Sequence, residues 1–369
     1  MNVVVLKNNL KEGLQIVSGI RPGTNTLPVL KNILIEAHDG KIILSATDLE
    51  MGVVHNVSAK VIEKGSVAVP FQIFSQIIQN LSSERVILEL QDTTLLVTTD
   101  NYRAKVSITS KDDFPIIPTL KDQITHVEIS AETFISALTA ILPACQVSEI
   151  RPELSGILFR ITQEGLVLVA TDSFRLAEKT ISKKQLSSTE EECSYIIPYK
   201  TAQEIVRIFS TVSESITIAF DKNQISCTSN NTTLISRLIQ GTFPEYEAII
   251  PKEFLTKGTV DIQDLSSALK LTSSLSNKLH EVVLKSQGGK TLTIFSASQE
   301  FGENEYVLPA KLQGDDAQVV FNWKFVLDGI RPLASKEVFV GINGEEKPSI
   351  FRSPEDTTFL YVVMPIKSS

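Results

Sequence analysis

Cysteine is scarce in this chain of 369 residues. The three cysteines, Cys145, Cys193 and Cys227, are widely spaced, and no two of them stand in a Cys-x-x-Cys pair. An odd number at such spacing does not form a disulfide framework, and the absence of a ligand pair argues against a zinc site. We therefore expect a reducing compartment, the cytoplasm, and no metal.

Long apolar runs and an excess of basic charge are also missing. No stretch approaches the roughly 18 apolar residues of a membrane span, and the apolar start of the chain is too short for a signal peptide. With 42% hydrophobic and 21% charged residues, the composition is that of a soluble globular protein. The net charge of −8 argues against a protein that holds nucleic acid by bulk electrostatics.

The common catalytic motifs are incomplete. Gly289-Lys290-Thr291 resembles the end of a phosphate loop, but Leu284 stands where the first glycine belongs, so a hairpin turn is the better interpretation. Leu284 also replaces the second histidine of a zincin motif opened by His280. Ser173 beside Asp172 could serve a hydrolase if the fold brought in a histidine, and this enzyme hypothesis stays as an alternative. We expect no catalysis and no cofactor.

One stretch recurs within the chain. Leu166–Ala170 is continuously apolar, which predicts a strand buried on both faces, and Thr171-Asp172-Ser173-Phe174-Arg175 then forms a polar bend. Ala46-Thr47-Asp48-Leu49-Glu50 ends an equivalent strand. The two aspartates, Asp48 and Asp172, are 124 residues apart, close to one third of the 369 residues. The spacing indicates an internal repeat.

Other features repeat at similar offsets. Leu10 and Leu14 on a predicted helix over 8–18 correspond to Phe134 and Leu138, and more loosely to Leu265 and Leu269. Proline opens a second helix at Pro70 and again at Pro198, and the third such helix is predicted at 322–325. Phe-Pro pairs at 114–115 and 243–244 correspond to Met-Pro at 364–365.

Each repeat is predicted to contain two halves of one strand, one helix and three strands. In the first repeat the strands are expected at 3–6, 32–37, 41–47, 51–58, 67–69, 85–90, 94–99 and 102–108, and the second helix at 71–81. Two helices on one face of antiparallel sheets make an α+β fold. The predicted domains are 1–122, 123–251 and 252–369.

Six such helices side by side leave a hole of about 9 Å, which is narrower than the DNA major groove at about 12 Å. Twelve helices leave a hole of about 28 Å. Two chains, head to tail, could therefore surround a duplex, although repeats also build solenoids and open arrays.

The triplication, together with Leu27–Asn32, Ala46–Met51, Ala170–Ala177, Phe243–Tyr246 and Tyr361–Pro365, resembles the β sliding clamps of bacterial DNA polymerase III over the whole chain. The resemblance implies a homodimeric ring of six similar domains. It implies that the ring encircles double-stranded DNA without sequence preference and confers processivity as a non-catalytic accessory subunit. The implied partners are the replicative polymerase, the clamp loader and repair proteins. A repeat scaffold that never encloses DNA is the alternative.

The resemblance also implies a pocket for a short linear motif of those partners. Phe174 stands where a histidine is common, Ala248 where an arginine can occur, and Lys367-Ser368-Ser369 replaces a more usual Arg-Leu ending; we expect these to shift peptide preference without removing the pocket. The pocket residues carried over are Leu154, Thr171, Ser173, Phe174, Arg175, Leu176, Pro244, Ile249, Val362, Met364, Pro365 and Ile366.

Contacts with DNA are expected from loop residues and from the exposed sides of the helices. The loop at Arg151 departs from the family, because Pro152 and Glu153 follow where aromatic residues are usual. The apolar contacts between copies are predicted at Val106, in an edge strand over 102–108, and at Leu275. The candidates for DNA contact are Arg21, Arg151, Lys11, Gln15, Lys200, Arg207, Lys270, Lys324 and Arg331.

Overall fold

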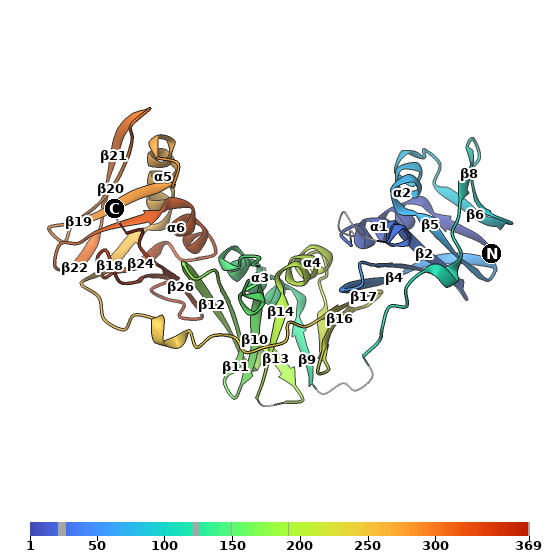
Figure 1. The fold of residues 1–369 in the computed structure, drawn as a ribbon, viewed down its shortest axis with the longest axis horizontal. Helices are drawn as coiled ribbons and strands as arrows, with labels where there is room; N and C mark the ends of the chain where they lie inside the picture. Colours follow the sequence, from blue (N-terminus) through green and yellow to red (C-terminus); the bar gives the residue numbers. More distant parts are fainter. Residues whose placement is uncertain (21–26, 121–124, 149, 191, 368–369) are drawn as a thin grey trace. The chain divides into compact units, whose positions relative to one another are not determined.

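The structure is a computed structural model that describes residues 1–20, 27–120, 125–148, 150–190 and 192–367. It contains two compact units (Figure 1). The first unit comprises Met1–Ala131 and Arg207–Leu238, and the second comprises Glu132–Val206 and Ile239–Ser369. The second sequence repeat contributes to both units, so the domain limits expected from the sequence stay a prediction.

The first repeat confirms the expected order of two halves, each with one strand, one helix and three strands. Pro70 precedes the second helix, as predicted, because proline lacks the N–H that the first turn of a helix leaves unpaired. The elements are β1 (Asn2–Leu6), α1 (Lys7–Val17), β2 (Asn32–His38), β3 (Lys41–Thr47), β4 (Met51–Glu63), β5 (Gly65–Pro70), α2 (Phe71–Asn80), β6 (Arg85–Gln91), β7 (Thr94–Thr98) and β8 (Arg103–Ser107).

The second repeat has the same order with one added short strand, β13. Its elements are β9 (Thr125–Ser130), α3 (Ala131–Ile141), β10 (Gly156–Thr162), β11 (Gly165–Thr171), β12 (Arg175–Ser182), β13 (Leu186–Ser188), β14 (Cys193–Pro198), α4 (Tyr199–Phe209), β15 (Ser215–Phe220), β16 (Gln224–Ser229) and β17 (Thr232–Arg237).

The third repeat, looser in sequence, keeps the order and adds β22. The side chain of Asn322 caps its second helix by accepting from the Lys324 N–H, so the helix begins one residue later than predicted and extends further. The elements are β18 (Thr256–Asp261), α5 (Ile262–Thr272), β19 (Glu281–Gln287), β20 (Thr291–Ser298), β21 (Gly302–Pro309), β22 (Lys311–Gly314), β23 (Gln318–Asn322), α6 (Trp323–Ile330), β24 (Glu337–Ile342), β25 (Ser349–Arg352) and β26 (Phe359–Val363).

Most strand limits agree with the prediction within two residues, but β4 is 13 residues long and passes its predicted end at Ser58. The extension arises because β4 has two successive partners. Its first part pairs with β17, and its last part pairs with β1. The hairpin predicted at Gly289 is confirmed, since β19 and β20 pair across Gly288 and Gly289, both with positive φ.

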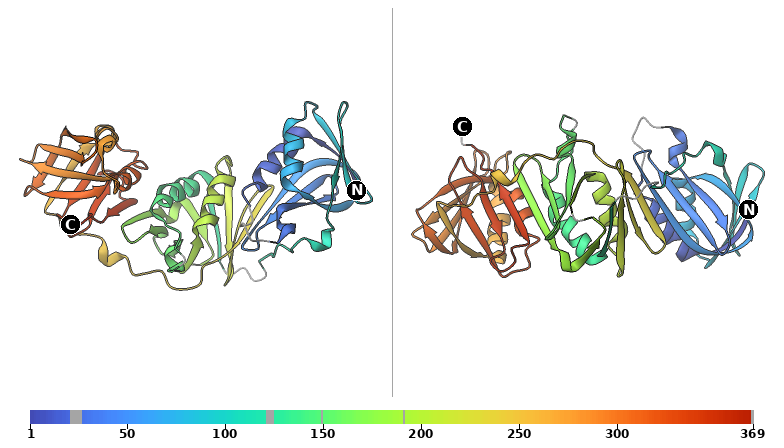
Figure 2. Two further views of the ribbon diagram at one scale, coloured as in Figure 1. Left: turned by 45° about the horizontal axis from the view of Figure 1, so that its top comes forward. Right: turned by 90° about the horizontal axis from the view of Figure 1, so that it is seen from below.

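In the first unit the strand order runs β9-β15-β16-β17-β4-β1-β6-β7-β8, and β3, β2 and β5 branch from β4. The helices α1 and α2 lie side by side (Figure 2) and contact each other. Their buried residues include Leu10, Leu14, Phe74 and Ile78, which face the sheet as the helical spacing requires.

The second unit contains a sheet in the order β14-β10-β11-β12-β26-β25-β24-β18-β22 and a separate sheet in the order β21-β20-β19-β23. The helices α5 and α6 contact each other, and their buried residues include Leu265, Leu269, Val326 and Ile330. No helix in the described part of the chain is long and apolar enough to cross a membrane.

A buried histidine joins the first and second repeats within the first unit. His55 on β4 is 9% exposed, and its Nδ1 lies 2.8 Å from the hydroxyl oxygen of Thr232 on β17. Burial lowers the pKa of His55 from 6.5 to about 4, because the charged imidazolium loses its hydration.

We predict that stability depends on His55 below pH 6.5. The pKa of His55 is lower in the folded chain than in the unfolded chain. The contribution of neutral His55 to the free energy of unfolding is therefore complete above pH 6.5 and is lost as the pH falls toward about 4. The free energy of unfolding falls by at most about 3 kcal/mol over this range. Urea unfolding between pH 7.5 and 4.5 should show this loss, and His55→Gln should flatten it. His38→Gln, at an exposed site, serves as the control; an unchanged slope in His55→Gln would contradict the assignment.

Candidate functional site

The bend after β11 is a tight turn fixed by its own side chains. The Thr171 hydroxyl donates to the carbonyl of Arg175 and accepts from the Ser173 N–H, at 2.8 and 3.2 Å. One carboxylate oxygen of Asp172 accepts from the N–H groups of Phe174 and Arg175, both at 2.9 Å. Ser173 has a φ of +73°, so the backbone reverses within three residues.

The first repeat builds the same turn 124 residues earlier. The Thr47 hydroxyl donates to the carbonyl of Met51, and Asp48 accepts from the N–H groups of Glu50 and Met51. Leu49 has a φ of +79°. The recurrence of Thr-Asp in the sequence therefore corresponds to one geometry, and the carboxylate of Asp172 is engaged in the turn.

The end of β26 runs beside the Thr171–Leu176 turn. Arg175 and Leu176 on β12 pair with Val363 and Val362, and the Met364 N–H then donates to the carbonyl of Phe174 at 2.8 Å. The pairing of β12 with β26 thus brings together residues nearly 190 positions apart in the sequence. In the first unit the Arg237 N–H donates in the same way to the carbonyl of Glu50, at 3.0 Å.

The predicted pocket residues separate by burial. Leu176 and Val362 are 1% exposed and belong to a buried cluster with Phe243 and Tyr246, so they form a floor and not a wall. Leu154 and Thr171 are 8% and 7% exposed. The more accessible members are Ser173, Phe174, Pro244, Ile249, Met364, Pro365 and Ile366.

The segment that follows β17 supplies a second side of the site. Arg160 on β10 donates to Glu247 at 2.8 Å and to the Tyr246 hydroxyl at 3.0 Å, which fixes this segment on the sheet. Ile249 and Met364 line one pocket of about 600 Å³. Phe254, Lys347 and Pro348 complete it on the side of the third repeat.

Three exposed apolar side chains, Val147, Ile150 and Leu255, did not enter the sequence prediction. Val147 and Ile150, in the loop between α3 and Leu154, are 66% and 92% exposed. Val147 and Ile150 are apolar residues in an otherwise polar stretch of sequence, and this pattern could have indicated an exposed contact site. Leu255, 44% exposed, lines the pocket of Ile249 and Met364.

The guanidinium of Arg175 does not point freely into solvent. Its Nε donates to Asp172 at 2.9 Å, and its Nη1 donates to Asp328 on α6 at 2.7 Å. Its plane lies over the ring of Phe325, 4.2 Å from the centroid. Burial disfavours the charged guanidinium, yet Tyr361, Asp328 and Asp172 more than offset this and raise the pKa of Arg175.

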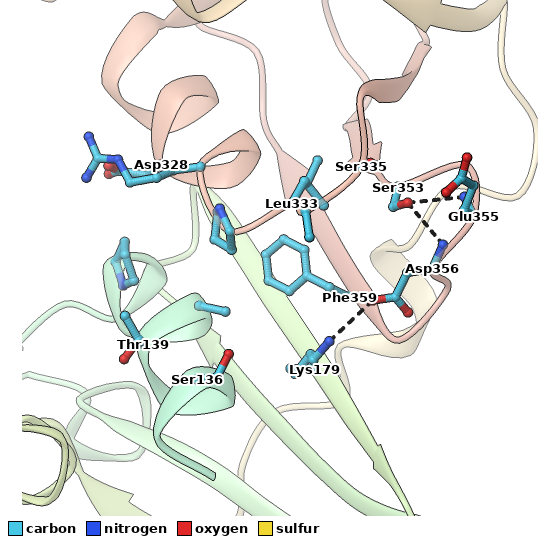
Figure 3. A pocket seen from close by; sticks show the side chains of 15 residues that line it. Ser136, Thr139, Lys179, Asp328, Leu333, Ser335, Ser353, Glu355, Asp356 and Phe359 are labelled. Carbon is cyan, nitrogen blue, oxygen red and sulfur yellow. Dashed lines mark hydrogen bonds and ion pairs between the residues drawn. The ribbon is translucent and has the colours of Figure 1, made fainter. Parts of the chain in front are cut away.

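A cavity of about 660 Å³ adjoins this cluster (Figure 3). Ser136 and Thr139 of α3 line one side, and Asp328 lies at one end of it. Phe359 lies in its middle, and Lys179 forms an ion pair with Asp356 at 3.5 Å beside it. This cavity was not predictable from the sequence, because its lining comes from four separate segments.

The described candidates for DNA contact are all exposed, but Arg207 also forms hydrogen bonds within the protein. Arg207 donates to the carbonyls of Gln15 and Ile16 at 2.9 and 2.5 Å, so its charge is placed at the carboxyl end of α1. Lys324 lies 2.9 Å from Nε2 of His280. The other exposed side chains are those of Lys11, Gln15, Arg151, Lys200, Lys270 and Arg331. Lys270 and Arg331 line one groove between α5 and α6. Arg21 lies outside the described residues.

The predicted dimer contacts also differ in exposure. β8 is the last strand of its sheet, as expected. Val106, however, is 5% exposed and pairs with Leu95, so alternation along the strand turns its side chain into its own core. Leu275 is half-buried, while its neighbours Leu271 and Leu279 are 59% and 64% exposed. As a contact between copies, Val106 stays a prediction that its burial weakens.

Family models cover nearly the whole chain. The N-terminal, central and C-terminal domains of the DNA polymerase III beta subunit match residues 1–118, 128–245 and 247–367. The chain belongs to this family. The family is that of the sliding clamps, non-catalytic accessory subunits that confer processivity, and a hydrolase built on Ser173 is therefore excluded.

Individual relatives agree over the full length. The chain is 30% identical to a beta sliding clamp of Staphylococcus epidermidis, covering 98% of this chain and 97% of that protein. The sliding clamp of Bacillus subtilis has the same fold, with a TM-score of 0.94, 23% identity and full coverage of both chains. A sliding clamp of Bartonella birtlesii bound to griselimycin is 26% identical, with a TM-score of 0.94 and full coverage of both chains.

Proposed function

We propose that this clamp closes into a head-to-tail dimer that encircles duplex DNA in the cytoplasm. One regularity of strand pairing supports this. The last strand of a repeat's first half pairs with the last strand of the next repeat: β4 with β17, and β12 with β26. The equivalent strand of the third repeat is β21 and the last strand of the first repeat is β8, and among the described residues neither pairs with a strand of another repeat.

The two remaining strands are complementary. β8 and β21 each end a sheet and have one partner strand among the described residues. Arg103 and Lys105 are exposed on β8, and Glu303 and Glu305 are exposed on β21. An unpaired edge is seldom left open in a native protein, and opposite charges across paired strands are favourable. Pairing β8 of one copy with β21 of another repeats the same junction and closes the ring.

We predict that charge reversal on one edge opens the dimer. Arg103→Glu with Lys105→Glu places four acidic residues across the junction, and the protein should then be a monomer of 40.6 kDa by light scattering. Adding Glu303→Lys with Glu305→Lys restores opposite charges and should restore the dimer. Lys60→Glu, at an exposed site outside both edges, is the control. A dimer that persists after the first reversal, at nanomolar protein, places the junction elsewhere.

The clamp function itself is tested by whether the ring stays on DNA because it encloses the duplex. A ring that slides needs few tight phosphate contacts, because each contact must be released along the path. Protein loaded on closed circular DNA should survive moderate salt and leave within minutes when a restriction enzyme linearises the circle. Gel filtration of the complex measures both. Equal retention on circular and linear DNA would instead indicate a scaffold bound by electrostatics.

We further propose that partner peptides bind at the Thr171–Leu176 turn and the strand end Val362–Ile366, over the floor made by Leu176 and Val362. Exposed apolar side chains border this floor, among them Phe174, 61% exposed, and Ile249, 45% exposed. Methionine at position 364 adapts to different apolar anchors. Val147 and Ile150, apolar and exposed in the loop before Leu154, are further candidates for contact with a partner.

Removing the strand end should weaken peptide binding. A short peptide with one Gln and two or three apolar anchors is expected to bind at micromolar Kd, about −8 kcal/mol. Deleting residues 364–369 removes Met364 and its bond to the Phe174 carbonyl, and calorimetry should then show affinity at least tenfold lower. Lys367→Ala keeps that bond and should bind normally. Unchanged affinity in the deletion would place the peptide site elsewhere.

A further inference from the structure

We propose that Asp328 is a positioning residue for the partner-peptide site: from helix α6 it holds the guanidinium of Arg175, and through it the Thr171–Leu176 turn. This inference rests on the peptide site proposed above. It assigns Arg175 a role inside the protein, although the family resemblance places that residue among those that receive the peptide.

The guanidinium of Arg175 has few hydrogen-bond donors left that a peptide could use. The Arg175 side chain is 12% exposed, and two of its nitrogen atoms donate to Asp172 and Asp328. Nη1 also lies 3.4 Å from the Tyr361 hydroxyl, and one face of the group is covered by Phe325. Charge-assisted bonds with fixed geometry and a stacked aromatic ring hold an arginine in a single orientation.

A continuous set of contacts runs from α6 to the peptide surface. Asp328 binds Arg175, whose Nε binds the second carboxylate oxygen of Asp172. The first oxygen of Asp172 fixes the N–H groups of Phe174 and Arg175. The Phe174 carbonyl then accepts from Met364. Release of the guanidinium would therefore loosen both borders of the site, the turn and the strand end.

The first repeat shows that the turn itself does not need an arginine. Met51 occupies the position of Arg175 there, and the Thr47–Met51 turn still closes with the same bonds between its Thr and Asp side chains and the backbone. Glu50 and Arg237, at the positions of Phe174 and Met364, form an exposed ion pair at 3.5 Å. The arginine is thus an addition at the junction where apolar side chains border the site, and its added contacts lead to α6 and β26.

Neutralising Asp328 tests this with a matched control. Asp328→Asn keeps the size of the side chain and removes the charge, and Asp356→Asn does the same for the other ion pair between β12 and the third repeat, with Lys179 at 3.5 Å. Amide hydrogen exchange in the dimer reports on Phe174, Arg175 and Met364 without any partner. Calorimetry with the Gln-containing synthetic peptide reports on the site.

In Asp328→Asn we expect exchange at these three amides to accelerate about tenfold and the peptide to bind about tenfold more weakly. Asp328→Glu should recover part of both effects, and Asp356→Asn should leave both within twofold. Arg175→Met, which installs the residue of the first repeat, should match Asp328→Asn. The double variant with Asp328→Asn and Arg175→Met should bind the peptide no more weakly than either single variant, because the effects of coupled residues are not additive.

The outcomes separate the two proposals. Unchanged exchange in Asp328→Asn, or additive losses in the double variant, would overturn the positioning role. Faster exchange with unchanged peptide affinity would overturn it as well, since the site would not depend on the turn. If the wild-type protein bound no peptide while exchange still accelerated, the proposed peptide site would fail and the link from α6 to the turn would stand.

Discussion

Antiparallel pairing between repeats is the constraint on which the structure depends. Without pairing to another repeat, the last strand of each repeat would have an unpaired edge, and an unpaired edge exposes backbone groups that must find partners. The chain solves this with one ladder used repeatedly, β4 with β17 in the first unit and β12 with β26 in the second. Among the described residues, β8 and β21 lack such a partner from another repeat, and the proposed closure through a second copy rests on this.

The ladder also creates the candidate site, because pairing brings a turn of one repeat beside the strand end of the next. Both ladders place an N–H of the strand end on a carbonyl of the turn, Met364 on Phe174 and Arg237 on Glu50. The geometry is therefore shared, and the side chains decide its use. Phe and Met present an apolar border, whereas Glu and Arg present an ion pair that water and salt screen well.

Features encoded locally or by repetition were predictable from the sequence. The strand-helix-strand order, the proline before α2 and the Thr-Asp turn each depend on a few neighbouring residues, and their recurrence at offsets near one third of the chain made them visible. The partners of Arg175 could not be predicted. Asp328 and Tyr361 lie 153 and 186 residues away, and no local pattern reports such a contact. The burial of Val106 within its own chain was not predictable either, because alternation along a strand shows that one face is buried but not which surface buries it, and its contact between copies stays a prediction.

The basic residues show why a protein of net charge −8 suits DNA held by topology. A protein that binds DNA by electrostatics needs many cations aimed at phosphates. Here Arg207 is placed on the carbonyls at the end of α1, and Arg175 is enclosed between carboxylates. The fold thus uses strong cations for its own helix end and repeat junction. An enclosing ring tolerates this, because its retention on DNA depends on the closure of its ladders and not on the sum of its phosphate contacts.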